Sequence, residues 1–148
     1  MIDIIDVTLR DGGHAVKFDW PLDMAKEYYQ IISDISDVKM IELGYWGQTA
    51  KSKNMFYDLD LEKVRQVTQS SNRNNVSVMI DYHYCSKDFN QYPDASQKEV
   101  SMIRVCSRKG DIDDALVFAQ RLKDETGILV SFNIFNFKLE SSSPAVWP

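Results

Sequence analysis

Residues 6–15 read Asp-Val-Thr-Leu-Arg-Asp-Gly-Gly-His-Ala, and they lie where a run of strand-forming residues meets a turn. The Ile, Val and Thr residues of positions 2–9 favour a β-strand. Arg10-Asp11-Gly12-Gly13 is typical of the turn that ends a strand. The stretch therefore places charged side chains directly after the first predicted strand.

The rest of the chain alternates between strand and helix periodicity. Further strands are predicted at residues 39–43, 76–82, 100–105 and 128–135. Helices are predicted after Pro21, Asp60 and Asp111, the last of them ending before Gly127. Residues 85–98 form a polar excursion with weak helical character. This order predicts βαβ units around a mostly parallel sheet.

Two folds contain five such units. A flavodoxin-like open sheet is complete at about 150 residues, and a chain of 148 residues fits that length. A (β/α)₈ barrel needs about 250 residues, so this chain would form little more than half of one. Periodicity alone does not choose between them, and length alone favours the open sheet.

Polar side chains follow or end each predicted strand. They are Arg10, Asp11, His14, Glu42, Asp81, His83, Arg104, Cys106, Asn133 and Asn136. In a parallel α/β fold the carboxyl ends of the strands meet at one edge, where sites are built. Each residue alone also has a structural interpretation. Asp11-Gly12 can be a simple turn, Glu42 can pair with a neighbouring arginine such as Arg10 or Arg104, and Cys106 can be a small buried hydrophobe.

The combination in residues 6–15 resembles the Asp-x-Thr-Leu-Arg-Asp-Gly signature of the HMG-CoA lyase-like superfamily. The histidine at position 14 is most similar to that of the 4-hydroxy-2-oxoacid (4-hydroxy-2-oxovalerate) aldolases. Weaker likeness continues in residues 41–44 and 102–105, so the resemblance covers roughly residues 2–136. It implies an incomplete (β/α)₈ TIM barrel of about five βα units, with residues 2–138 in the catalytic domain and residues 139–148 as an irregular tail.

The resemblance also implies a chemistry. Asp11 would be a ligand of Mn²⁺ or Mg²⁺, and the metal would bind a 2-oxoacid substrate. Arg10 would stabilise the negative charge of an enolate, and His14 would handle the proton of the 4-hydroxyl group. Glu42 would orient the site. The resemblance implies no role for Asp81, Arg104 or Asn133. The parent protein is expected to cleave or form a carbon–carbon bond.

Two departures qualify this expectation. The family completes its metal site with a His-x-His pair from a later strand, and no histidine follows His83 here. The chain as given is therefore expected to be inactive, with an incomplete metal site. Position 13 is Gly where such aldolases often carry a bulkier residue. The alternatives are an acyl-CoA-condensing enzyme of the same superfamily, similar to isopropylmalate or citramalate synthase, and a non-catalytic flavodoxin-like binding module.

Composition bounds the partners. The net charge is −5 and no basic stripe appears, which argues against nucleic acid. No apolar run approaches the roughly 20 residues of a membrane span. The two cysteines form no zinc-type pair, so a cytoplasmic protein with reduced thiols is expected.

A barrel opened after five strands has two unpaired edges. We also expect an uncovered apolar interior face, built from Ile4, Met40, Val78, Ile103 and Phe132. These features predict a symmetric homodimer.

Overall fold

A computed structural model of the chain describes residues 3–47, 54–69, 73 and 75–135. Five parallel strands form one sheet in the order β1-β2-β3-β4-β5. They are β1 (Ile4–Asp6), β2 (Val38–Tyr45), β3 (Val76–Asp81), β4 (Met102–Ser107) and β5 (Leu129–Ile134). A flavodoxin-like sheet has the order 2-1-3-4-5. The sequential order therefore excludes that alternative.

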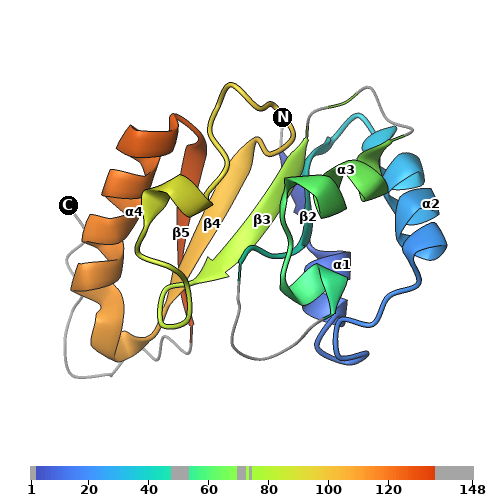
Figure 1. Ribbon diagram of the computed structural model, residues 1–148. Helices are drawn as coiled ribbons and strands as arrows, with labels where there is room; N and C mark the ends of the chain where they lie inside the picture. Colours follow the sequence, from blue (N-terminus) through green and yellow to red (C-terminus); the bar gives the residue numbers. More distant parts are fainter. Residues whose placement is uncertain (1–2, 48–53, 70–72, 74, 136–148) are drawn as a thin grey trace.

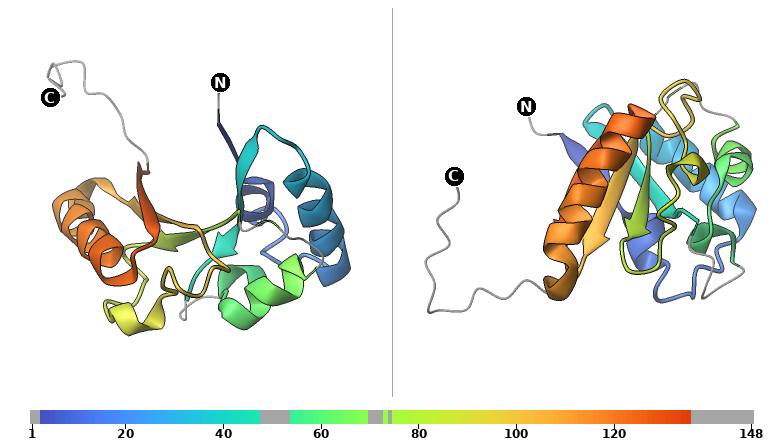
Figure 2. Two further views of the ribbon diagram at one scale, coloured as in Figure 1. Left: turned by 90° about the horizontal axis from the view of Figure 1, so that it is seen from above. Right: turned by 60° about the vertical axis from the view of Figure 1, so that its left-hand side comes forward.

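The helices are α1 (Thr8–Gly12), α2 (Leu22–Ser33), α3 (Leu61–Thr68) and α4 (Ile112–Thr126). Short 3₁₀ helices are η1 (Met55–Tyr57), η2 (Phe89–Gln91) and η3 (Lys109–Asp111). The sheet is curled, and α2, α3 and α4 lie along its outer side (Figures 1 and 2). None of the helices in the described part of the chain is long and apolar enough to cross a membrane.

The outer face of the sheet carries the apolar core. Val78 and Ile80 of β3 and Ile103 and Val105 of β4 are 0% exposed beneath the helices. The expected uncovered apolar interior was therefore wrong for Val78 and Ile103, because they belong to the helix-covered face. Phe132 pairs in register with Val105, so it lies on that face as well. This placement follows from the two-residue period of a strand, which assigns alternate residues to opposite faces.

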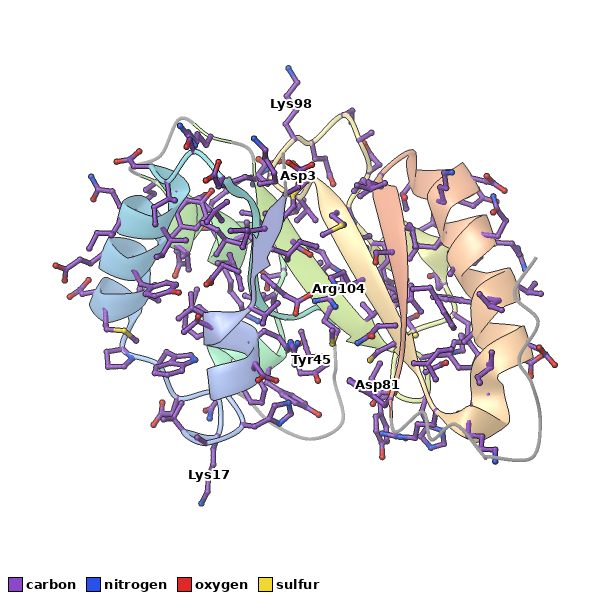
Figure 3. The ribbon with its side chains drawn as sticks, turned by 180° about the vertical axis from the view of Figure 1, so that it is seen from behind. Asp3, Lys17, Tyr45, Asp81, Lys98 and Arg104 are labelled. Atoms are coloured by element: carbon purple, nitrogen blue, oxygen red, sulfur yellow. The ribbon has the colours of Figure 1, made fainter. Side chains whose placement is uncertain are left out.

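The opposite face of the sheet, here called the inner face, is polar. It carries Glu42, Ser77, Met79, Asp81, Met102, Arg104, Cys106, Ser131 and Asn133, which are aligned by the strand register. Figure 3 looks onto this face, with Arg104 in the middle of the sheet and Asp81 towards the carboxyl ends of the strands. Polar and charged groups are thus concentrated on the side of the sheet away from α2, α3 and α4, beside the buried Met79 and Met102.

The first strand is shorter than predicted. Residues 7–9 were expected to continue it, but β1 ends at Asp6 and α1 begins at Thr8. The Asp6 carboxylate accepts hydrogen bonds from the backbone N–H of Thr8 (3.2 Å) and from its hydroxyl (3.0 Å). Such side-chain acceptors favour a turn over a continuing strand. Arg10 and Asp11 therefore lie on a short helix, and not in the turn that the glycines suggested.

Other expected boundaries hold with small shifts. Asp60 caps α3 by accepting from the Lys63 N–H at 2.9 Å, and Gly127 ends α4 in the left-handed conformation (φ 67°). Asp111 makes no side-chain cap bond to α4. The fourth strand ends at Ser107, two residues later than predicted. Residues 136–148, which include Asn136 and the predicted tail, lie outside the described residues.

Candidate active site

The centre of the inner face is a buried ion-pair network. Glu42 is 0% exposed, and its Oε1 accepts from Arg10 Nε at 2.6 Å. Arg104 reaches the same carboxylate from β4, with Nη1 3.1 Å from Oε2 and 3.2 Å from Oε1. The predicted contact of Glu42 with Arg10 is therefore present. Arg104, for which the resemblance implied no role but which the sequence offered as a possible partner of Glu42, is its second partner.

Two members of the network, Arg10 and Glu42, are buried, and Arg104 is partly exposed. Burial alone would lower the pKa of Arg10, but the hydrogen bond and charge of Glu42 outweigh it and raise that pKa. Arg10 therefore remains a cation although the residue is only 7% exposed. Two guanidinium groups thus share the buried carboxylate of Glu42, and the exposed carboxylate of Asp11 is a second acceptor for Arg10.

Two buried polar atoms of this region lack hydrogen-bond partners within the described structure. They are Arg104 Nε and Ser77 Oγ. Ser77 pairs in register with Glu42 on the neighbouring strand, so it projects to the same face. A buried donor without an acceptor costs free energy, and such atoms often bind water or a ligand.

Asp11 lies at the exposed edge of the network. Its Oδ1 accepts from Arg10 Nη1 at 2.9 Å, and its side chain is 69% exposed. Arg10 is thus held on one side by a buried carboxylate and on the other by one that reaches solvent.

His14 lies beside Tyr45, a residue that sequence reasoning missed. Its Nε2 is 3.5 Å from the Tyr45 hydroxyl. Burial raises the pKa of Tyr45, so the phenol stays protonated at neutral pH. The ring of Phe18 packs edge-on against both rings, at 5.0 Å from His14 and 5.6 Å from Tyr45. These aromatic contacts hold His14 near the end of β2.

An irregularity in β2 brings Tyr45 to this position. Glu42 pairs with Ser77, but Tyr45 pairs with Met79, so three steps along β2 match two along β3. Such an irregularity re-aims a side chain, here onto the inner face. Gly44 occupies the extra step, and a Cβ there would lie 2.0 Å from the carbonyl oxygen of Phe56. Glycine at position 44, which the sequence suggested only as a strand end, therefore permits the close approach of η1.

Gly13 is the position where the resemblance showed a departure. A Cβ at this residue would lie 2.5 Å from the ring of Phe18. Phe18 itself adopts a positive φ of 61°, as does Lys17 at 56°. Glycine at position 13 thus makes room for the aromatic ring that packs on His14.

A second ion pair lies at the carboxyl ends of β3 and β4. Arg108 Nη2 is 2.8 Å from Asp81 Oδ2, and the Asp81 side chain is 10% exposed. Asp81 Oδ1 also accepts from the backbone N–H of His83 at 3.0 Å. His83 lies at the same rim, with Nδ1 3.6 Å from Asp111 Oδ2. Arg108 was not among the predicted site residues.

The predicted residues are only partly at strand ends. Asp81 does end β3, but Glu42, Arg104 and Asn133 lie inside their strands and project from the inner face. Cys106 is 0% exposed and donates its thiol hydrogen to the carbonyl of Ile80 at 3.2 Å. Burial raises the pKa of Cys106 to about 12, so this thiol is a structural group at neutral pH.

No group of three or more His, Cys, Asp or Glu side chains within the described residues could hold a metal ion. Surface hollows of about 290, 270 and 380 Å³ lie between the helices and the loops, and their walls contain none of Arg10, Glu42 and Arg104. The charged inner face, and not these hollows, holds the candidate site. Its chemistry resides in buried arginines fixed by carboxylates.

Comparison with solved structures identifies a similar fold. The chain is similar to the N-terminal domain of a "putative aldolase" from Bacteroides vulgatus, with a TM-score of 0.73 and 24% sequence identity. The match covers 90% of this chain and 44% of that one, so the chain spans less than half the length of its structural neighbour. No protein-family model matches the chain, and neither does any curated protein.

Proposed function

We propose that this chain is the N-terminal part of an incomplete (β/α)₈ barrel from a carbon–carbon lyase that acts on a 2-oxoacid. Five parallel strands in sequential order, with helices along one side, agree with the first five strands of such a barrel. The structural neighbour is described as an aldolase domain and is more than twice as long as the matched region. Residues 2–138 would then belong to one catalytic domain.

The observation that carries the proposal is the pair of Arg10 and Glu42. When the carbon–carbon bond of a 4-hydroxy-2-oxoacid breaks, its electron pair forms an enolate and negative charge builds on the 2-oxo oxygen. A guanidinium that is already oriented can stabilise that charge without reorganising. Glu42, wholly buried at 2.6 Å from Arg10 Nε, supplies this orientation. Arg104 holds Glu42 from the other side.

His14 would take the proton of the 4-hydroxyl group. The hydroxyl oxygen becomes the carbonyl oxygen of the released aldehyde, so its proton must leave as the bond breaks. An imidazole titrates near neutral pH and suits this role. His14 is exposed, and its Nε2 lies 3.5 Å from the neutral phenol of Tyr45, which would orient the ring.

A divalent metal, Mn²⁺ or Mg²⁺, remains an expectation of the family resemblance. Asp11 is the expected ligand, but its carboxylate binds Arg10 and no further ligands join it within the described residues. The residues present do not fit a metal site on their own, so the proposal assigns no step to a metal. We expect calorimetry to show that this chain binds Mn²⁺ no more tightly than a surface carboxylate does. Micromolar affinity would show that the ligands were misassigned, with His83 the first residue to test.

The test compares the 148-residue chain with the protein encoded by the complete reading frame. We expect only the longer protein to release pyruvate from a 4-hydroxy-2-oxoacid, either 4-hydroxy-2-oxovalerate or 4-hydroxy-2-oxoglutarate, measured with a coupled lactate dehydrogenase assay. Arg10→Lys should lower the rate by about 10²–10³-fold, as the loss of one oxyanion donor does. Arg65→Lys is the matched control, because Arg65 pairs with Glu99 at 2.8 Å on the surface. An Arg10→Lys variant that cleaves at the unchanged rate, or no pyruvate from the longer protein, contradicts the proposal.

A further inference from the structure

Two arginines near this end of the sheet are each held by a buried carboxylate. Arg10 is held by Glu42 of β2, and Arg108 is held by Asp81 of β3. Both carboxylates are buried, with side-chain exposures of 0% and 10%. A guanidinium backed by a buried carboxylate has a fixed orientation, and it keeps several of its five N–H donors for another acceptor.

Arg108 differs from Arg10 in its access to solvent. Its side chain is 43% exposed, and its guanidinium carbon lies 5.0 Å from the centre of the Tyr84 ring. Asp81 engages Nη2, and the side chain of Tyr84 also interacts with the guanidinium, so two neighbours fix its orientation. An ion pair contributes little to the stability of the fold when one partner is this exposed. A ligand-binding role accounts for both the fixed orientation and the exposure.

The two arginines flank Cys106. This buried thiol pairs in register with Asp81, and it lies within electrostatic reach of Arg10, Glu42, Asp81 and Arg108. Glu42, which holds Arg10, pairs with Ser77, and Asp81, which holds Arg108, lies four residues further along β3, so the two positions are roughly 14 Å apart. A hydrogen bond at each end of a ligand covers about 6 Å of this distance. Figure 3 shows Tyr45 of β2 and Asp81 of β3 near the same lower end of the sheet. An extended molecule of five or six carbon atoms is of the right order to span the remainder.

We propose that Arg108 binds a second anionic group of the substrate, so that the substrate is a 2-oxoacid with a carboxylate at its far end. The inference rests on the proposed function, because Arg10 is taken to bind the 2-oxo end. Arg108 would select for length and charge through a charge-assisted, two-point hydrogen bond. Asp81 would act as the residue that positions it.

The test compares the binding of two five-carbon acids, 2-oxoglutarate and 2-oxovalerate. They differ only in a carboxylate or a methyl group at the far end. Isothermal calorimetry is performed on the protein encoded by the complete reading frame, in buffer with Mg²⁺. We expect 2-oxoglutarate to bind about tenfold more tightly or better, as a charge-assisted hydrogen bond requires.

Arg108→Gln should remove this preference and leave the affinity for 2-oxovalerate unchanged, and Arg108→Lys should keep part of it. Arg65→Gln, on the surface pair with Glu99, should keep the full preference. Equal binding of the two acids by the native protein, no binding of either, or a preference that survives Arg108→Gln overturns the inference.

Arg10→Gln separates this inference from the proposed function. It should weaken the binding of both acids by the same factor. If Arg10→Gln changes neither affinity while Arg108→Gln removes the preference, the anion site stands and the assigned role of Arg10 fails. If Arg10→Gln weakens both acids and the native protein shows no preference, the proposed function stands and the role of Arg108 fails.

Discussion

The two faces of the sheet are built from the same strands but follow different rules. In β4, Ile103 and Val105 face the helices and are 0% exposed, while Arg104 between them faces inward and binds Glu42. The outer face is held by apolar packing, which is non-directional. The inner face is held by a few charged contacts of defined geometry. A position next to a hydrophobic core, such as Arg104, therefore need not be part of that core.

The difference matters because substitutions on the two faces lower the stability of the fold for different reasons. Truncating an apolar side chain leaves a cavity, and its cost depends on how far the surroundings collapse. Removing one member of a buried ion pair leaves an uncompensated charge, which is often more costly. Matched substitutions on the two faces can therefore test whether the inner face is held by its charges.

The largest effect is expected at Glu42. Glu42→Gln leaves Arg104 without its carboxylate partner and leaves Arg10 with only the exposed Asp11 as counter-charge, and it should lower the free energy of unfolding by about 3–5 kcal/mol. Urea unfolding followed by circular dichroism measures this. Glu99→Gln is the control, since Glu99 pairs with the half-exposed Arg65 and should lose about 1 kcal/mol or less. Equal losses at the two positions would show that the inner network contributes no more than a surface pair.

A smaller difference is expected between two neighbours in β4. Ile103→Ala, on the helix-covered face, should cost about 2–5 kcal/mol, because packed helices on one side restrict collapse. Met102 is 4% exposed on the inner face, where no helix restricts its surroundings. Met102→Ala should therefore cost less than Ile103→Ala in the same urea experiment. A larger loss at Met102 would mean that the inner face is the more rigidly packed of the two.

The edges of the sheet test whether the inner face is covered by a second copy. As predicted, β1 and β5 are the edge strands. They expose Ile4 (46%), Ile5 (40%) and Leu129 (55%). Unpaired edges favour pairing with another chain, so we expect a homodimer in sedimentation velocity at micromolar concentration. The double variant Ile4→Lys/Leu129→Lys should be monomeric.

The control for the edges is Ile31→Lys. Ile31 lies on α2, on the helix-covered side of the sheet, and is 59% exposed, but it belongs to neither edge strand. It should leave the dimer intact. A monomeric native chain, or a dimer that Ile31→Lys disrupts and the edge variant does not, would assign the association to another surface.

The alternation of strands and helices could be predicted because each element carries a local signal. The apolar stripe of α4 ends at Gly127, which is left-handed in the structure, and Asp60 caps α3 as expected. The end of β1 was wrong because Thr8 and Leu9 suit a strand, while the hydrogen bonds of Asp6 to Thr8 begin a helical turn. Strand propensity depends on residue type alone, so it does not take this side-chain contact into account.

The candidate site was partly predictable for a different reason. Arg10, Asp11 and His14 lie in one short motif, and the contact of Glu42 with Arg10 was expected from their shared placement at strand ends. Arg104 and Arg108 belong to no such motif, and their roles depend on which strands are neighbours. Tyr45 reaches the site through the irregular register of β2, which no periodicity of the chain reveals. Contacts between distant residues thus required the structure.

The smallest effect is expected from the protonation state of the Cys106 thiol on the inner face. Burial raises the pKa of this thiol to about 12, although α2, α3 and α4 all lie along the other face of the sheet. The ordinary value is 9.0, so the folded state retains a proton that the unfolded state loses as the pH rises. The stabilising contribution is complete below about pH 9 and is lost progressively as the pH approaches 12. We expect the free energy of unfolding of Cys106→Ala to fall less steeply with pH over this window than that of the native protein.

Alkylation by iodoacetamide at pH 9, followed by mass spectrometry, should leave Cys106 unmodified in the folded chain and label it in urea. Rapid alkylation of the folded chain would show that the inner face is open to solvent at its centre, and the contrast between the faces would then be one of charge alone.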